Sequence, residues 1–161
     1  MGSTVTIGIR DKGAIELIHT LLMQGIRVHI KVSGHSMAPL LVSEKTIELG
    51  PINQPKRGDI IFFNDEQRGP LAHRLIRRRY YKGALYLQTK GDACTNFDNF
   101  ISIEQALGTV RRIFPSSSTC SQTVNLRSPP MRINAFCIVA LALFRYYRSK
   151  TKSFLINYKK K

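Results

Sequence analysis

The chain has 161 residues, 43% of them hydrophobic, which is enough for one domain of ordinary size with its own core and an appended segment. Its formal net charge is +15, and all ten acidic residues lie at or before Glu104, whereas eleven Lys and Arg residues follow it. The part after Glu104 is therefore purely basic, which suits an anionic lipid surface or a nucleic acid; a merely solvated basic tail is the alternative.

The cysteines and the N-terminal region argue against several protein classes. Cys94, Cys120 and Cys137 are odd in number, far apart and without metal-ligand spacing. We therefore expect unpaired thiols, no disulfide framework, no metal and no cofactor. Residues 1–31 mix charged and apolar groups and never offer the continuous apolar core of a signal peptide.

The first predicted element is a short amphipathic helix over residues 14–25. Its apolar stripe comprises Ile15, Ile18 and Leu22, widened by Leu17 and Leu21. Gly25 is expected to end the helix as a C-terminal cap. Residues 1–26 are therefore predicted to form an N-terminal helical segment.

From Arg27 onward the hydrophobic period changes to two. Val28, Ile30 and Val32 share one face of the segment RVHIKVSG, which is typical of a half-buried strand. Further short strands are predicted at residues 46–50, 59–64, 73–81, 84–91 and 108–114, most of them bounded by Gly, Pro, Asn or Asp. This pattern predicts a mainly β domain over residues 27–114.

Two segments follow the β domain. Residues 115–130 are rich in Ser, Thr and Pro and are predicted to be a linker, and residues 131–161 form an apolar and basic tail. In the tail, every residue from Ile133 to Phe144 except Asn134 is apolar. At about 1.5 Å per residue this run measures roughly 18 Å, against roughly 30 Å of bilayer hydrocarbon.

A run of that length favours a helix that lies at the membrane interface or packs on the protein over a helix that spans the bilayer. We therefore expect a membrane-associated protein, either peripheral or anchored through its C-terminal segment. Three free cysteines favour a peripheral position on an inner leaflet. If the segment spanned the membrane, its lysine-rich end would favour the cytoplasm and leave the β domain outside, so the side of the membrane stays open.

The segment SGHSMAPLL, residues 33–41, directly follows the first predicted strand and presents Ser36. A serine hydroxyl attacks a carbonyl group slowly unless a base takes its proton. His73 begins a later predicted strand and is the best candidate base, because an imidazole exchanges protons near neutral pH. His35 is poorly placed, since neighbouring residues on an extended chain point to opposite sides.

Two carboxylates lie in the loop TKGDACTNFDN, residues 89–99, which follows a predicted strand. Asp92 and Asp98 are in the kind of loop where a carboxylate orients a histidine. Alternatively, Asp92 forms a turn through its own backbone and Asp98 caps a helix. We expect Asp92 to orient His73 and Asp98 to fix the loop or tune its charge.

The ordered blocks SGHSMAPLL, RGDIIFF, AHRLI, TKGDACTNFD and LGTV, within residues 27–113, resemble the type I signal peptidase superfamily in its Ser/His branch, typified by endoplasmic-reticulum and archaeal enzymes. The resemblance implies Ser36 as nucleophile, His73 as general base, and Asp92 and Asp98 as supporting carboxylates. It also implies a partly open β-fold, which self-cleaving repressor proteases share. The activity that it implies is cleavage of precursor polypeptides after small residues near a membrane.

The chain departs from this family at several positions. Gly34 stands where members commonly have a hydroxyl residue that helps to hold the oxyanion, so the Ser36 backbone N–H and Ser33 are the remaining candidate donors. A missing donor costs about 10²–10³ in rate. Met37 and Pro39 are candidate substrate-binding residues. The lysine block of the bacterial branch has no counterpart, and the N-terminal span of most members is missing.

We therefore expect a serine endopeptidase that acts on a precursor polypeptide at an anionic membrane surface. Two other functions stay open. A self-cleaving repressor shares the pattern Gly34-x-Ser36-Met37, but it needs a DNA-binding module, for which residues 1–26 are too short, and it uses lysine. A non-catalytic basic module would bind a membrane surface or nucleic acid through residues 74–82 and the tail, but no nucleic-acid motif accompanies them, so we expect no nucleic-acid partner.

Overall fold

The structure is a computed structural model and describes residues 12–115 and 123–158, with side chains for residues 13–115 and 123–148. The elements in chain order are α1 (Lys12–Met23), β1 (Val28–Lys31), β2 (Thr46–Gly50), β3 (Ile60–Asp65), β4 (Gly69–Tyr81), β5 (Ala84–Lys90), β6 (Phe100–Ser102), the 3₁₀ turn η1 (Ile103–Gln105), β7 (Ala106–Phe114), β8 (Val124–Asn125) and α2 (Pro129–Tyr158). The predicted mainly β protein with a short N-terminal helix and a C-terminal helix is confirmed.

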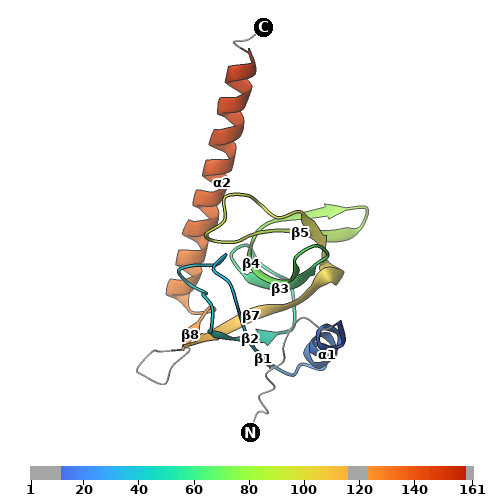
Figure 1. Cartoon of the computed structure of the whole chain (residues 1–161). Coiled ribbons are helices and arrows are strands. Elements are labelled where there is room, and N and C mark those ends of the chain that lie inside the picture. Colours follow the sequence, from blue (N-terminus) through green and yellow to red (C-terminus); the bar gives the residue numbers. More distant parts are fainter. Residues whose placement is uncertain (1–11, 116–122, 159–161) are drawn as a thin grey trace.

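The described strands form one curled antiparallel sheet in the order β1-β2-β7-β3-β4-β5-β6, with β8 paired to β7 (Figure 1). Every predicted strand is present, and β4 begins at Gly69, earlier than the predicted residue 73. Neither β6 nor β8 was predicted, because strands of three and two residues are too short to show a period. β8 falls in the expected linker, of which residues 116–122 lie outside the described part.

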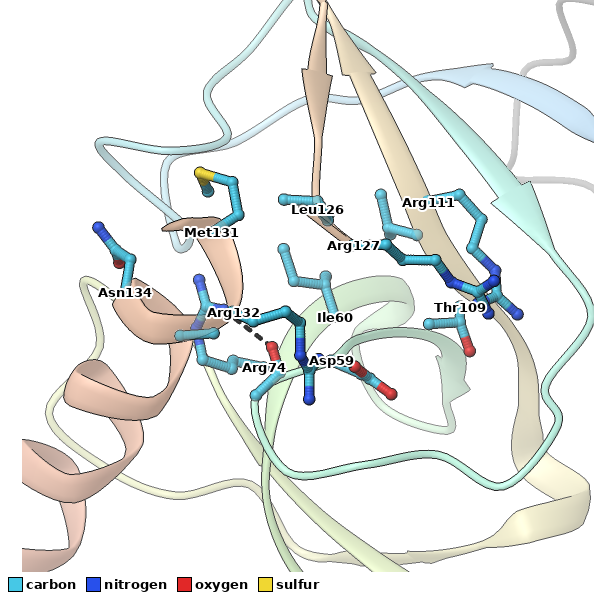
Figure 2. A pocket seen from close by; sticks show the side chains of 13 residues that line it. Asp59, Ile60, Arg74, Thr109, Arg111, Leu126, Arg127, Met131, Arg132 and Asn134 are labelled. Atoms are coloured by element: carbon cyan, nitrogen blue, oxygen red, sulfur yellow. Dashed lines mark hydrogen bonds and ion pairs between the residues drawn. The ribbon is translucent and has the colours of Figure 1, made fainter. Parts of the chain in front are cut away.

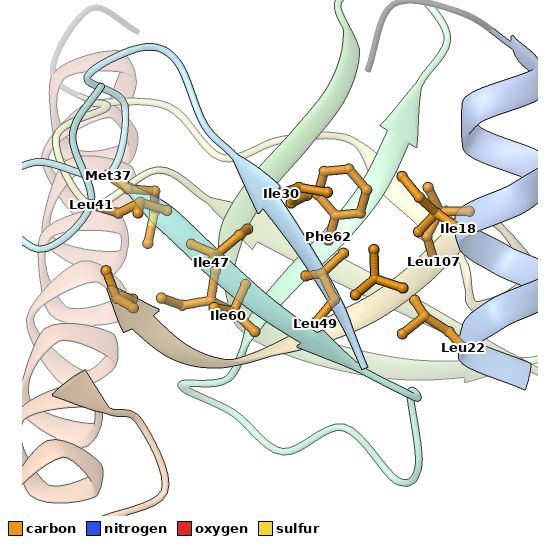
Figure 3. Close-up of a cluster of buried hydrophobic side chains, with 13 residues drawn as sticks. Ile18, Leu22, Ile30, Met37, Leu41, Ile47, Leu49, Ile60, Phe62 and Leu107 are labelled. Carbon is orange, nitrogen blue, oxygen red and sulfur yellow. The ribbon is translucent and has the colours of Figure 1, made fainter. Parts of the chain in front are cut away.

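α1 packs across the sheet through one apolar face. Ile18 and Leu22 are fully buried in a cluster with residues of β1, β2, β3 and β7 (Figure 3). Leu17 is 47% exposed, so its expected place on the buried stripe is wrong: at 100° per residue it lies too far around the helix from Ile18. As predicted, Gly25 caps the helix with φ +78°, and the N–H of Ile26 donates to the carbonyl of Leu21 at 2.9 Å.

β3 supplies side chains to two separate hydrophobic clusters. Ile60 and Phe62 pack in the α1 cluster, whereas Ile61 and Phe63 pack in a second cluster with residues of β4, β5 and β6. Successive side chains of a strand point to opposite faces, so a run of four buried apolar residues means that both faces of β3 are covered. β3 is therefore the central strand against which β4 is positioned.

α2 lies on the opposite side of the β domain from α1 and extends well beyond the sheet (Figure 1). Its base is fixed by an ion pair between Arg132 and Asp59 (Figure 2). The buried Ala135 and Val139 also hold it in place. Gly58 has φ +90°, and a Cβ atom at this position would lie 3.0 Å from the Cβ of Ala135. The helix therefore approaches the backbone closely at a glycine.

Among the described residues, no helix is both long enough and apolar enough to cross a membrane.

We expect Gly58→Ala to destabilise the protein more than Gly83→Ala does. Both glycines have positive φ, +90° and +79°, but only Gly58 faces a neighbour. The backbone strain costs about 1–2 kcal/mol in each variant, and the contact with Ala135 adds about 1 kcal/mol or more in Gly58→Ala. Chemical denaturation of both variants measures the difference, and equal losses would show that the contact with α2 contributes nothing.

Candidate active site

β4 presents two buried polar residues in succession. His73 and Arg74 are both 2% exposed. Because neighbouring residues of a strand point to opposite faces, their side chains leave β4 in opposite directions. Each of these side chains meets one carboxylate of the β5–β6 loop, residues 91–99.

The imidazole of His73 bridges Ser36 and Asp98. Its Nε2 atom lies 2.9 Å from Ser36 Oγ, and its Nδ1 atom lies 2.7 Å from Asp98 Oδ2. The two ring nitrogens thus contact a hydroxyl on one side and a carboxylate on the other. This is the connectivity of a Ser-His-Asp triad, which is recognised by geometry rather than by order along the chain.

Asp98 is buried and accepts hydrogen bonds from three side chains. Besides His73, Thr89 Oγ1 donates at 2.8 Å and Arg68 Nη2 donates at 2.9 Å. Burial alone would raise the pKa of Asp98, but the hydrogen bonds from His73 and Thr89, the charge of His73 and the bond from Arg68 outweigh it and lower the pKa to about 2. Asp98 is therefore a carboxylate at neutral pH.

Asp92 does not contact His73, so the expectation that it orients this histidine is wrong. Its carboxylate forms a bidentate ion pair with Arg74, at 2.8 Å from Nε and 2.6 Å from Nη2. Arg74 also donates to the carbonyl of Gly58 at 2.9 Å. The reason is the alternation along β4, which places Asp92 on the Arg74 side of the strand and leaves His73 to Asp98.

The β5–β6 loop packs directly against the Ser36 backbone. The N–H of Ala93 donates to the carbonyl of Ser36 at 2.9 Å. A Cβ atom on Gly91 would lie 2.6 Å from that carbonyl oxygen and 3.2 Å from His73 Nε2. Only glycine allows this approach, so Gly91 sets the distance between the two loops that form the site.

The backbone around Ser36 leaves one candidate oxyanion donor. Gly34 has φ +100°, and its N–H is occupied by a 2.8 Å hydrogen bond to Ser43 Oγ. The Ser36 N–H has no acceptor among the described residues. Ser33 is exposed and has no hydrogen bond within the described part of the chain. Its role as a second donor stays a prediction.

The two candidate substrate-binding residues differ in position. Met37 is 2% exposed and belongs to the α1 cluster, and its sulfur accepts the N–H of Asp92 at 3.4 Å. Met37 is therefore a core residue, and its expected contact with substrate is wrong, because its side chain is packed inside the α1 cluster. Pro39 is exposed beside the site, and its contact with substrate stays a prediction.

Other bases and ligands are also accounted for. The ammonium of Lys90 donates to the carbonyl of Gly91 at 3.1 Å, and His35 is exposed. Cys94 and Cys137 are free, and Cys120 lies outside the described residues. Within residues 12–115 and 123–158, no three His, Cys, Asp or Glu side chains gather as a metal-binding group.

Several residues of the site were not predicted from the sequence. Thr89 and Gly91 stand within the block TKGDACTNFD, so their closeness to two aspartates was the available signal. Arg68 lies in the turn before β4 and carries no such signal. The walls of a cavity at the base of α2 include Arg74 but not Ser36, His73 or Asp98 (Figure 2).

α2 contacts the same loop from outside. Phe97, next to Asp98, stacks on Tyr146 with ring centroids 5.0 Å apart. The Arg77 guanidinium lies 5.2 Å from the Phe97 ring and 4.4 Å from the Tyr146 ring. Arg77 is therefore held against the aromatic rings of the loop and of α2.

No protein-family model, no curated protein and no solved structure matches the chain. The candidate active site is therefore defined by its own geometry, which joins Ser36, His73 and Asp98 from three separate parts of the sequence.

The low pKa of Asp98 predicts how stability depends on pH. Because the folded pKa of about 2 lies below the ordinary aspartate pKa of 3.8, the carboxylate stabilises the fold above pH 3.8, and this contribution is lost as the pH falls towards 2. We expect the loss of unfolding free energy from about pH 5 to about pH 2 to be about 2 kcal/mol smaller in Asp98→Asn than in the parent. Denaturant titrations at both pH values measure the free energy of unfolding of each variant. Glu104→Gln, at an exposed carboxylate, is the control and is expected to behave like the parent.

Gly91→Ala is expected to separate the two loops of the site. The added methyl group overlaps the Ser36 carbonyl and the Cys94 sulfur, which a Cβ atom would approach to 2.6 and 2.7 Å. We expect reaction of Ser36 with a serine-directed phosphonate to slow by about tenfold or more, because displacing a reacting group by a fraction of an ångström is costly. Mass spectrometry of the labelled protein checks this, and labelling at the parent rate would contradict the proposed role of Gly91.

Proposed function

We propose that the chain is a serine endopeptidase in which Ser36 is the nucleophile, His73 the general base and Asp98 the carboxylate that orients His73. The observation that carries the proposal is the continuous hydrogen-bonded series from Ser36 Oγ through both ring nitrogens of His73 to Asp98. The five sequence blocks that resemble the signal peptidase superfamily support the same roles for these residues.

In the first step, Ser36 Oγ attacks the carbonyl carbon of a peptide bond while His73 Nε2 takes the hydroxyl proton. The C–N bond then breaks, and the proton passes from His73 to the leaving amine, which leaves an ester on Ser36. Water hydrolyses this ester with His73 acting as base again. Asp98 stays ionised throughout and holds the Nδ1 side of the ring.

The environment of Asp98 favours this division of roles. Thr89 and Arg68 fix both oxygens of the carboxylate, so it meets His73 in one orientation. A carboxylate with a pKa of about 2 does not take the proton from the imidazolium near neutral pH. The Ser36 N–H is the donor available for the developing oxyanion.

The substrate class follows from the resemblance. We propose an extended segment of a precursor polypeptide, cleaved after small residues. A panel of peptides with Ala, Gly, Leu or Lys before the cleaved bond, analysed by mass spectrometry, tests this preference. Cleavage after Leu or Lys in preference to Ala would exclude the proposed substrate class but leave the mechanism in place.

The proposed roles predict a pattern of reactivity towards a fluorophosphonate probe. Ser36→Ala is expected to abolish labelling, and His73→Gln and Asp98→Asn to slow it by about 10³–10⁴-fold, because the base is lost or misoriented. Intact-mass measurement over time gives these rates, and the same variants are compared for peptide cleavage.

Asp92→Asn is the matched control, since it makes the same change to the other carboxylate of the loop. It leaves the Arg74 guanidinium buried without its partner, which costs about 3–5 kcal/mol of stability, but Asp92 forms none of the hydrogen bonds that join Ser36, His73 and Asp98. We expect it to react at nearly the parent rate at temperatures where circular dichroism shows it folded. Fast labelling of Asp98→Asn together with slow labelling of folded Asp92→Asn would overturn the assignment.

A further inference from the structure

α2 is apolar on two opposite faces, and only one of them is covered. Ala135 and Val139 face the β domain and are 6% and 4% exposed. At 100° per residue, Ile133, Leu141 and Phe144 lie on the far side of the helix and Phe136 lies on its flank; they are 66%, 56%, 64% and 74% exposed, respectively. We call these four residues the outer stripe of α2.

A helix that is apolar all round is normally buried in protein or lipid. Here four large apolar side chains, including two phenylalanines, are exposed within twelve residues of one helix. Large exposed apolar side chains gathered on one element mark an interaction site. We therefore expect a binding partner to cover the outer stripe.

The basic charge around the outer stripe indicates the chemistry of this partner. No acidic residue follows Glu104, whereas eleven Lys and Arg residues do, among them the exposed Arg145 and Arg148 beside the outer stripe. A second copy of this chain placed on the stripe would bring two such basic segments together, which like-charge repulsion opposes. An anionic lipid surface offers both an apolar boundary for the stripe and negative charge for its flanks.

We propose that the outer stripe of α2 is an interfacial docking surface for an anionic lipid bilayer, with the helix lying along the surface. The apolar run from Ile133 to Phe144 measures about 18 Å at about 1.5 Å per residue, which is short against about 30 Å of hydrocarbon but suits burial of one face at the headgroup boundary. This inference goes beyond the proposed peptidase activity and does not depend on it.

Docking of the outer stripe on a bilayer would hold the candidate active site at a fixed position relative to the lipid surface. The inner side of α2 carries Tyr146, which stacks on Phe97 next to Asp98. The outer stripe and the candidate active site thus lie on either side of one helix.

Flotation of the full chain with vesicles tests the proposal. We expect binding to vesicles of phosphatidylcholine mixed with phosphatidylglycerol, weaker binding to phosphatidylcholine alone, and a decrease as salt is raised. The double variant Phe136→Glu/Phe144→Glu is expected to bind at least about tenfold more weakly, since two aromatic side chains no longer enter the boundary.

Met23→Glu is the matched control, because Met23 is also 74% exposed but lies on α1. It is expected to bind like the parent, as is Ser36→Ala, which separates membrane docking from catalysis. Circular dichroism and chemical denaturation, compared with the parent, check that the double variant keeps its fold.

Three results would overturn the proposal. They are failure of the parent to bind anionic vesicles, equal binding by the parent and the double variant, and a parent dimer in solution that the double variant abolishes. The last result would assign the outer stripe to a second copy of the chain.

Discussion

The alternation of side chains along β4 is the constraint on which the site depends. His73 and Arg74 leave the strand on opposite faces, and each binds one aspartate of the β5–β6 loop. The loop is thereby held from both sides of a single strand, near its beginning at Asp92 and near its end at Asp98. With Gly91 allowing close contact, this arrangement brings the loop against Ser36.

Compensation of buried charge explains why this arrangement is stable. Asp98 and Arg74 are almost inaccessible to solvent, and an unpaired charge in such a place is costly. Each is matched by several hydrogen-bonding partners: Asp98 by His73, Thr89 and Arg68, and Arg74 by Asp92 and a backbone carbonyl. The same bonds that offset burial also fix the orientation of the imidazole, so stability and the geometry of the site have a common origin.

Hydrophobic period and turn residues predicted the β domain, its principal strands and both helices, because these signals are local. The sequence blocks were also enough to select Ser36, His73 and the loop with Asp92 and Asp98. They could not predict which aspartate contacts His73, because that depends on the path of the loop across β4. The burial of Met37 and the position of Arg77 under α2 likewise depend on contacts between segments far apart in the chain.

The stack of Phe97 on Tyr146 connects α2 to the β5–β6 loop directly beside Asp98. Arg77 Nε and Nη2 are buried without a hydrogen-bond acceptor among the described residues, so the aromatic ring faces are what offsets the Arg77 charge there. A tilt of this helix of thirty residues that parted Tyr146 from Phe97 would expose that guanidinium and loosen the residue preceding Asp98. The position of α2 is thus coupled, through Phe97, to the residue next to the carboxylate that binds His73.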